Sequence, residues 1–206
     1  MTVNSSSQAR PYHHGALKTA VLEAAALILE RDGIAGLTLR GAAREAGVSH
    51  AAPKNHFGDL AGLLSELAAS GYVRLREEML AGADAAKSPS ARLHAIGAAY
   101  VNFARSNPAL FLLMFRRERL DMDRPALREA AGALFEVLAG AVGREADSGP
   151  ALDEREAVEM ALAWSQVHGL AMLLIDGRLR PILNRLPGMD EEAFVSRLLA
   201  QPGVEG

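Results

Sequence analysis

The chain has 206 residues, contains no cysteine and carries a formal net charge of −3 at pH 7. The missing cysteines exclude disulfides, thiolate metal sites and a cysteine nucleophile, while a hydrophobic content of 50% is enough for a sizeable buried core. Alanine and leucine are abundant and β-branched and aromatic residues are few, so the composition predicts an all-α protein.

The front of the chain differs in charge from the remainder. Residues 1–12 are polar and lack the apolar stretch of a signal peptide, which predicts a flexible arm. Residues 1–58 hold six Lys and Arg against four Asp and Glu, a balance of +2, and the rest holds 16 against 21, a balance of −5. A mildly cationic front on an acidic body fits a small DNA-binding head, although ordinary solvated charges can give the same balance.

Three short helices are predicted within residues 13–58. Apolar residues at helical spacing indicate the first, over 14–31, and two glycines follow it. Thr38 is placed to cap the second, over 39–46, by accepting a hydrogen bond from a free backbone N–H. The third is predicted from 49 to 57.

The sequence Ala43-x-x-x-Gly47-Val48-Ser49 joins the second and third helices. The small side chain of Ala43 lets the helices cross closely, and Gly47 can adopt the positive φ that a tight turn needs. Val48 is expected to fill the core beneath the turn. Ser49 is expected to cap the third helix, which makes Pro53 its fourth residue. Such a pair forms a helix-turn-helix, whose second helix enters the major groove of DNA.

Six more helices are predicted behind this segment, which brings the total to about nine. The first of them, within 59–82, links the head to a body that occupies 83–206. Side chains that can cap a helix, several of them followed by proline, mark the starts. In chain order the helices begin near Asp59, Ser88, Asn107, Pro125, Asp153 and Asp190, and the long one that opens at Asp153 extends to Asp176.

The head and a motif near the C-terminus resemble one protein family. Residues 13–64, with GLTLRGAAREAGVS, HF at 56–57 and LL at 63–64, are similar to the DNA-binding head of TetR-family transcriptional regulators. YHHG at 12–15 and WSQVHG at 164–169 resemble a subgroup with a Trp-His-Gly (WHG-type) ligand-binding domain. The resemblance implies a homodimeric repressor that binds a pseudo-palindromic DNA operator and is released by a small, largely apolar effector.

Candidate DNA-binding residues lie on the arm and on the three helices of the head. Third-helix side chains would read bases, since Asn pairs with adenine and Lys favours guanine or a phosphate. Second-helix side chains would hold phosphates and fix the register, with further contacts from the arm and first helix. The set comprises Arg10, Lys18, Thr38, Arg40, Arg44, Ser49, His50, Ala51, Lys54, Asn55 and His56.

Two positions depart from the family's pattern. The family usually has tyrosine where this chain has Lys54, and often lysine where it has Leu60. Both usual residues anchor backbone phosphate, which a leucine side chain cannot do. Two interpretations therefore stay open: a ligand-responsive repressor, and an all-helical ligand-binding or interaction protein with a weak or vestigial head.

The helix predicted over 153–176 is apolar over a wide arc, so it is expected to be buried on two sides. One side would face the core and the other a second subunit, which predicts a homodimer through this helix and the last one. One apolar stripe consists of Ala157, Ala161, Trp164, His168, Ala171 and Ile175, and the other of Met160, Ala163, Val167, Leu170 and Leu174.

Trp164 and His168 lie one helical turn apart on a shared face. They are either core residues or a pocket wall on which His168 orients an apolar effector. Other aromatic and methionine side chains are open to the same two interpretations, core or ligand site. The candidate effector-binding residues are Tyr100, Phe103, Phe111, Met114, Phe115, Phe135, Trp164, His168 and Met172.

No catalytic motif accompanies these features. The sequence holds no G-x-S-x-G, glycine-rich phosphate loop or H-E-x-x-H. The chain is therefore expected not to be an enzyme and to need no cofactor or metal. Its expected partners are double-stranded DNA, a second copy of itself and an unknown small-molecule effector. No apolar run reaches the roughly 18 residues of a membrane span, so a cytoplasmic protein without a membrane partner is expected.

Overall fold

The computed structural model describes residues 13–143 and 151–200, so the predicted arm over 1–12, with Arg10, lies outside the described residues. Regular structure in the described ranges is entirely helical, which confirms the all-α prediction. The elements are α1 (His13–Gly36), α2 (Leu39–Glu45), α3 (Ala52–Phe57), α4 (Leu60–Asp84), α5 (Pro89–Ser106), α6 (Pro108–Met114), η1 (Arg117–Arg119), α7 (Pro125–Ala141), α8 (Glu154–Ile175), α9 (Arg180–Leu183) and α10 (Glu191–Ala200).

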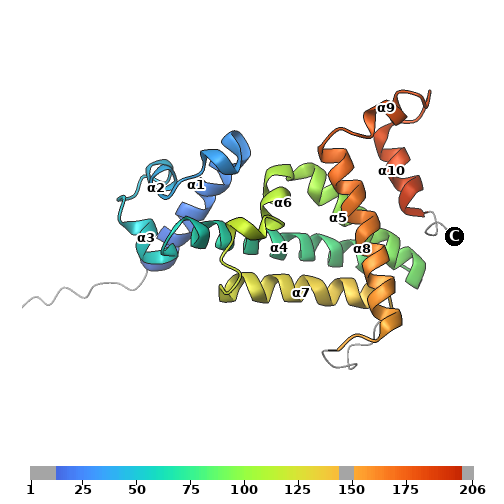
Figure 1. Cartoon of the computed structure of the whole chain (residues 1–206), viewed down its shortest axis with the longest axis horizontal. Coiled ribbons are helices and arrows are strands. Elements are labelled where there is room, and N and C mark those ends of the chain that lie inside the picture. The colour runs from blue at the N-terminus through green and yellow to red at the C-terminus, as the bar shows by residue number, and fades with distance from the viewer. Residues whose placement is uncertain (1–12, 144–150, 201–206) are drawn as a thin grey trace, which may run out of the picture.

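The long helix α4 runs through the middle of the molecule, and helices of both the head and the body pack against it (Figure 1). The helices α1, α2 and α3 form a small head at one end of it, and α7 runs alongside its remaining length. The helices α5 and α6 also pack on α4, and α8 crosses α5 with α10 beyond it. The four-residue α9 was not predicted, since so short a helix has no periodic pattern to detect.

Local sequence signals set most of the helix starts. The Thr38 hydroxyl accepts a hydrogen bond from the Gly41 N–H at 2.9 Å, and the Ser88 hydroxyl accepts one from Ala91 at 3.1 Å. Asp153 forms a capping box with Glu156 at the start of α8. The carboxylates of Asp59 and Asp190 each accept a hydrogen bond from a backbone N–H, and so cap α4 and α10. The predicted caps at Thr38, Ser88 and Asp153 are confirmed.

The predicted cap at Ser49 is wrong. The helix α3 begins at Ala52, the residue before it makes no side-chain capping bond, and Ser49 contributes only its carbonyl, to the Ala52 N–H at 3.0 Å. The later start puts Pro53 in the first turn, where a backbone N–H has no partner within the helix. The proline therefore removes no helical hydrogen bond, and its side chain is buried.

The predicted cap at Asn107 is also wrong in its chemistry. Pro108 does open α6, but the Asn107 side chain makes no capping bond to that helix. Its amide instead donates back to the Phe103 carbonyl at 3.1 Å, and its carbonyl oxygen accepts from Arg74 at 2.8 Å. Asn107 thus closes α5 and ties it to α4.

The first helix passes its predicted end at Arg31 and continues to Gly36. Gly33 nevertheless has φ 70° and ψ −176°, which is not helical, so the regular helix is interrupted at the first of the two glycines. Only glycine adopts this backbone conformation without strain. The bend lets Leu37, which is 1% exposed, reach the core of the head.

The head and the body share one continuous core. Buried side chains of the head, such as Ile28 and Phe57, belong to the same cluster as Leu64 of α4 and Phe111 of α6. A smaller second cluster joins α5, α8 and α10. The predicted division between a head over 13–58 and a linking helix stays a prediction, and buried apolar contacts cross it without a break.

The helix α8 keeps an apolar face exposed. The stripe that begins at Met160 packs into the core, whereas the stripe that begins at Ala157 is exposed at its first turns and buried near its end. A third apolar row, assigned to neither stripe by the sequence, is exposed at Val158 (52%), Leu162 (66%) and Leu173 (40%). Within the described residues, α8 alone has the length and apolar composition of a membrane span, and 17% of its most apolar 18-residue stretch is buried.

Candidate functional site

The turn between α2 and α3 has the predicted geometry. Gly47 has φ 66°, which favours glycine, and its N–H donates to the Arg44 carbonyl at 3.1 Å. Val48 follows with a bond to the Ala43 carbonyl at 2.9 Å and packs against the core, and Ala43 itself is fully buried. The predictions for these positions are confirmed, and the turn sets α3 across α2.

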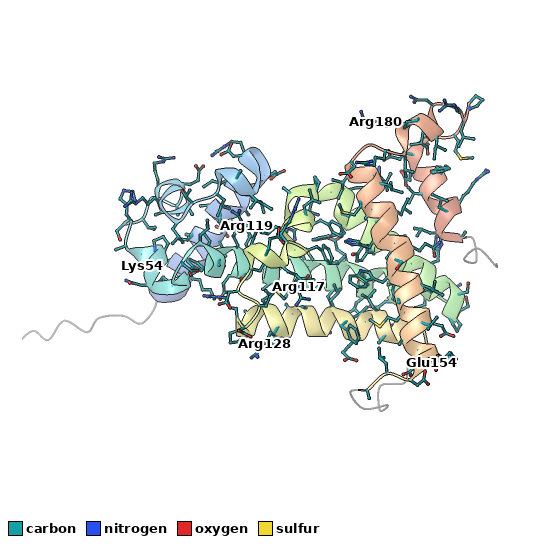
Figure 2. The ribbon with its side chains drawn as sticks, viewed as in Figure 1. Lys54, Arg117, Arg119, Arg128, Glu154 and Arg180 are labelled. Carbon is teal, nitrogen blue, oxygen red and sulfur yellow. The ribbon has the colours of Figure 1, made fainter. Side chains whose placement is uncertain are left out.

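The polar side chains of this unit face solvent. Lys54 lies at the end of the molecule that the head forms (Figure 2). Thr38 is exposed although its hydroxyl is used as a cap, and His56 is half-buried. Whether these residues bind DNA stays a prediction. Besides Thr38, the exposed members of the candidate set are Arg40, Arg44, Ser49, His50, Ala51, Lys54 and Asn55.

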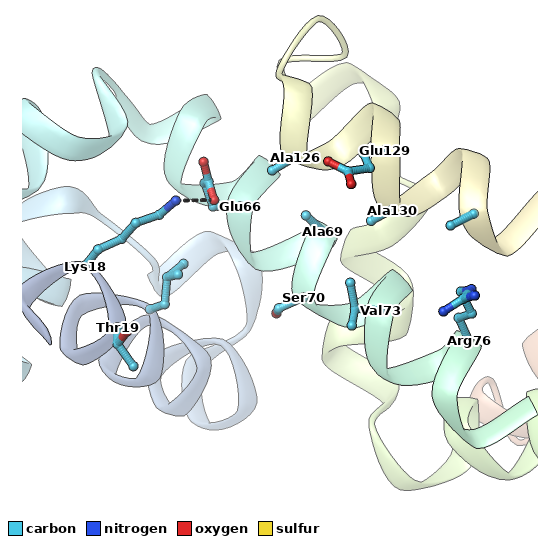
Figure 3. A pocket seen from close by; sticks show the side chains of 12 residues that line it. Lys18, Thr19, Glu66, Ala69, Ser70, Val73, Arg76, Ala126, Glu129 and Ala130 are labelled. Atoms are coloured by element: carbon cyan, nitrogen blue, oxygen red, sulfur yellow. Dashed lines mark ion pairs between the residues drawn. The ribbon is translucent and has the colours of Figure 1, made fainter. Parts of the chain in front are cut away.

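Two positions at the edge of the head are engaged within the protein. The Lys18 ammonium forms an ion pair with the Glu66 carboxylate of α4 at 2.8 Å (Figure 3). Leu60, where the family often has a phosphate-binding lysine, is half-buried and packs against the core at the start of α4. The leucine therefore serves the packing of the head on α4.

Rings from α5, α6 and α8 form the centre of the candidate effector site. The His168 ring lies 4.6 Å from the Phe115 ring, 5.6 Å from Phe111 and 5.9 Å from Trp164, centroid to centroid. The Tyr100 ring meets Phe111 edge to face at 5.5 Å. These five side chains, which we call the ring cluster, are packed against one another. Tyr100 and Phe111 are fully buried, whereas Trp164 is 43% exposed.

The polar atoms of the ring cluster form a directed chain. The Tyr100 hydroxyl lies 2.9 Å from His168 Nδ1 and 3.4 Å from the Trp164 indole nitrogen. An indole N–H can only donate, so the Tyr100 oxygen accepts from Trp164. The buried phenol proton has an acceptor within reach when it is donated to His168 Nδ1. Burial lowers the pKa of His168 and raises that of Tyr100, which keeps the imidazole neutral and the phenol protonated. The imidazole proton is then on Nε2.

The remaining effector candidates lie outside the ring cluster. Phe103 faces α4, with the Arg74 guanidinium carbon 5.7 Å from its ring centre. Met114 is buried against Gly71, Met172 is half-buried, and Phe135 is 40% exposed. A residue that the sequence did not single out, Tyr72 of α4, packs its ring on Phe115 at 6.1 Å and donates to the Met114 carbonyl at 2.8 Å.

An open groove of about 610 Å³ lies between α1, α4 and α7 (Figure 3). None of the predicted effector residues lines it. Its floor is formed by small apolar side chains, including Ala69 and Ala130, and its edge by Lys18, Glu66 and Arg76. The groove is therefore distinct from the ring cluster.

Lowering the pH below about 6.5 is expected to destabilise the protein through His168. The unfolded chain takes up a proton on this imidazole near that pH, whereas burial lowers the pKa of His168 in the folded chain. The contribution of His168 to the free energy of unfolding is therefore fully present above about pH 6.5, and it is lost as the pH falls towards the pKa of His168 in the folded chain. Urea unfolding at about pH 7.5 and 5.5 should show a smaller pH effect in His168→Gln than in the wild type.

The variant Trp164→Phe is the control for this measurement. It removes the indole hydrogen bond and keeps the imidazole, so it should retain the wild-type dependence on pH. An equal dependence on pH in His168→Gln and the wild type would contradict the assignment.

Comparison with known proteins identifies the family. Residues 93–201 match the family model described as Tetracyclin repressor-like, C-terminal domain. Over 97 residues the chain is 30% identical to the uncharacterised HTH-type transcriptional regulator YobS of Bacillus subtilis, and it spans 50% of the length of that relative and 47% of its own. The chain belongs to the TetR family of transcriptional regulators, a family of DNA-binding proteins and not of enzymes.

Solved structures share the fold over nearly the whole chain. A protein of unknown function from Rhodococcus sp. RHA1 is 33% identical, with a TM-score of 0.70 and coverage of 93% of both chains. A TetR-family regulator from Marinobacter aquaeolei is 18% identical, with a TM-score of 0.63 and coverage of 90% of this chain and 94% of its own. The multidrug binding protein EbrR, solved with imidazole, is 20% identical, with a TM-score of 0.52 and coverage of 88% and 92%.

Proposed function

We propose that the protein is a ligand-responsive repressor that binds a pseudo-palindromic operator as a homodimer. The observation that carries the proposal is the helix-turn-helix, whose turn is built as DNA reading requires and whose outer side chains are exposed. Lys54 and Asn55 of α3 would read bases, and Arg40 and Arg44 of α2 would hold phosphates. A two-fold dimer would place its heads about 34–36 Å apart on one face of the duplex.

The exposed apolar face of α8 supports a homodimer. Val158, Leu162 and Leu173 leave large side chains in solvent at helical spacing, and large apolar side chains exposed along one face of a helix favour a contact with another molecule. We assign it to a second copy of the chain, because a closed two-fold interface uses the same surface twice. This assignment also accounts for the apolar composition of α8 in a protein that we place in the cytoplasm.

The ring cluster supports an apolar effector. An effector that enters beside Trp164 would meet aromatic walls and one polar chain, in which the His168 Nε2–H is a hydrogen-bond donor. The fitting ligand is therefore small and largely apolar and carries a hydrogen-bond acceptor. Binding would release the operator by favouring a body conformation whose heads no longer match the half-site spacing.

Replacing Asn55 by alanine is expected to weaken binding to the operator by about 1–3 kcal/mol and to relax one base position. Genomic binding-site selection with the purified protein would supply the operator, and titration at several salt concentrations would give the affinity. Asn102→Ala is the matched control, since Asn102 is an exposed asparagine of α5 in the body.

The same experiment separates the two functions left open by the sequence. Sequence-specific, salt-sensitive binding supports the repressor. Selection that returns no enriched site, with an Asn55→Ala variant indistinguishable from Asn102→Ala, would favour a ligand-binding protein with a vestigial head.

A further inference from the structure

The segment before α7 is tied directly to the end of α3. The Arg124 side chain, 18% exposed, donates from Nε to the Glu66 carboxylate at 2.8 Å. Its other two nitrogens donate to the backbone carbonyls of Phe57 and His56, each at 3.2 Å. One guanidinium from the body therefore holds α4 and the carbonyl end of α3 together.

The charges in this junction favour one another. The free carbonyls at the end of a helix carry partial negative charge, which a cation stabilises. Burial raises the pKa of Glu66, but the hydrogen bonds from Lys18 and Arg124 outweigh it and leave the pKa lowered. The carboxylate is thus ionised at neutral pH, with Lys18 on one oxygen and Arg124 on the other. We call Lys18, Glu66, Arg124 and the two carbonyls the junction network.

The backbone of α4 is shaped around the junction network. A Cβ atom on Gly62 would collide with the Phe57 carbonyl oxygen and lie 2.6 Å from an Arg124 nitrogen. Glycine at this position therefore opens the path along which the guanidinium reaches α3. One turn further on, the fully buried Ser65 hydroxyl accepts from the Asp121 N–H at 2.8 Å. The segment that carries Arg124 is fixed on α4 at both positions.

We infer that Arg124 is a positioning residue that sets the orientation of α3 from the body. The inference rests on the proposed DNA binding, because it concerns how Lys54 and Asn55 are presented. The two carbonyls that Arg124 holds belong to residues that directly follow Asn55 in the chain. A shift of the start of α7 therefore reaches the DNA-reading side chains through a direct contact, in addition to any movement of α4.

The test compares Arg124→Gln with Arg124→Lys and with the control Arg128→Gln, an exposed arginine one turn along α7. Hydrogen exchange in peptides covering residues 52–58 needs neither DNA nor effector. In Arg124→Gln this exchange should quicken by about tenfold or more, because a hydrogen-bonding charge is lost, while peptides of the ring cluster keep their rate. Arg124→Lys should restore part of the protection, since it keeps the charge but loses the fork of donors.

Operator titration supplies the second measurement. Arg124→Gln should weaken specific binding by about tenfold or more and leave the salt dependence unchanged, because a positioning residue releases no counterions from DNA. A salt slope lower by about one unit would instead show that Arg124 binds a phosphate itself, and would overturn the inference.

Exchange and affinity in Arg124→Gln equal to those in Arg128→Gln would also overturn it. If Arg124→Gln does not fold, the variant Glu66→Gln replaces it in the test. It should also quicken hydrogen exchange over residues 52–58 and weaken operator binding. If the wild type binds no specific operator, the proposed function fails, whereas the exchange data still decide whether Arg124 holds α3.

Discussion

Replacing Leu162 by aspartate is expected to convert the proposed dimer into a monomer. Leu162 is 66% exposed at the centre of the apolar face of α8, so the change costs little in the isolated chain. In a two-fold dimer each subunit would bury one unpaired carboxylate, and the dissociation constant should rise about 100-fold or more, equivalent to about 3 kcal/mol. Sedimentation at micromolar concentration measures the change, and operator affinity should fall with it.

Val73→Asp is the matched control for this prediction. Val73 is a 44% exposed apolar residue of α4, away from α8, and the same charge there should leave the protein dimeric. Circular dichroism of both variants should show wild-type helix content. A Leu162→Asp variant that sediments as a dimer would remove the apolar face of α8 from the interface.

Replacing Phe111 by alanine is expected to destabilise the chain by about 3–5 kcal/mol. Phe111 is fully buried and its ring contacts Tyr100, Phe115 and His168 at 5.0–5.6 Å between centroids. The loss combines the forfeited free energy of burying a large ring with the cost of the cavity that the surrounding side chains fill only in part. Denaturant unfolding measures the free energy of unfolding. The midpoint concentration of denaturant should fall, and the slope of the free energy against denaturant concentration should stay unchanged.

Phe135→Ala makes the same chemical change at an exposed position. Phe135 is 40% exposed on α7, so its loss should cost less than about 1 kcal/mol in the monomer. Equal losses in the two variants would mean that the ring cluster packs loosely and contributes no more than a surface contact.

Features that depend on neighbouring residues could be predicted from the sequence. The cap at Thr38, the positive φ of Gly47 and the capping box at Asp153 each need only a backbone N–H or a turn a few residues away. Ser49 shows where such signals fail. A residue of a capping type does not by itself fix the first residue of the helix, which can begin a few positions later. The chain starts α3 at Ala52, where Pro53 fits the first turn and can be buried.

Features that depend on distant residues could not be predicted. The periodicity of α8 indicates an apolar helix but does not say which arc meets the core, and the exposed row at Val158 and Leu162 was therefore missed. Likewise, no local pattern connects Arg124 with Glu66 and Phe57, which lie 58 and 67 residues away. Tyr100 and His168 were each singled out, but their hydrogen bond exists only because α8 crosses α5.

The continuous core also determines where this protein can be recombined with its relatives. Leu63, Leu64 and Leu67 belong to α4, yet they share one buried cluster with Val21 and Phe57 of the head. A chimera joined between Gly58 and Asp59 would pack these leucines against the head of another protein, and it would break the junction network at Glu66. A graft of this head should therefore carry α4 beyond Leu67 and bring the segment around Arg124 with it, so that the transplanted unit is discontinuous in sequence.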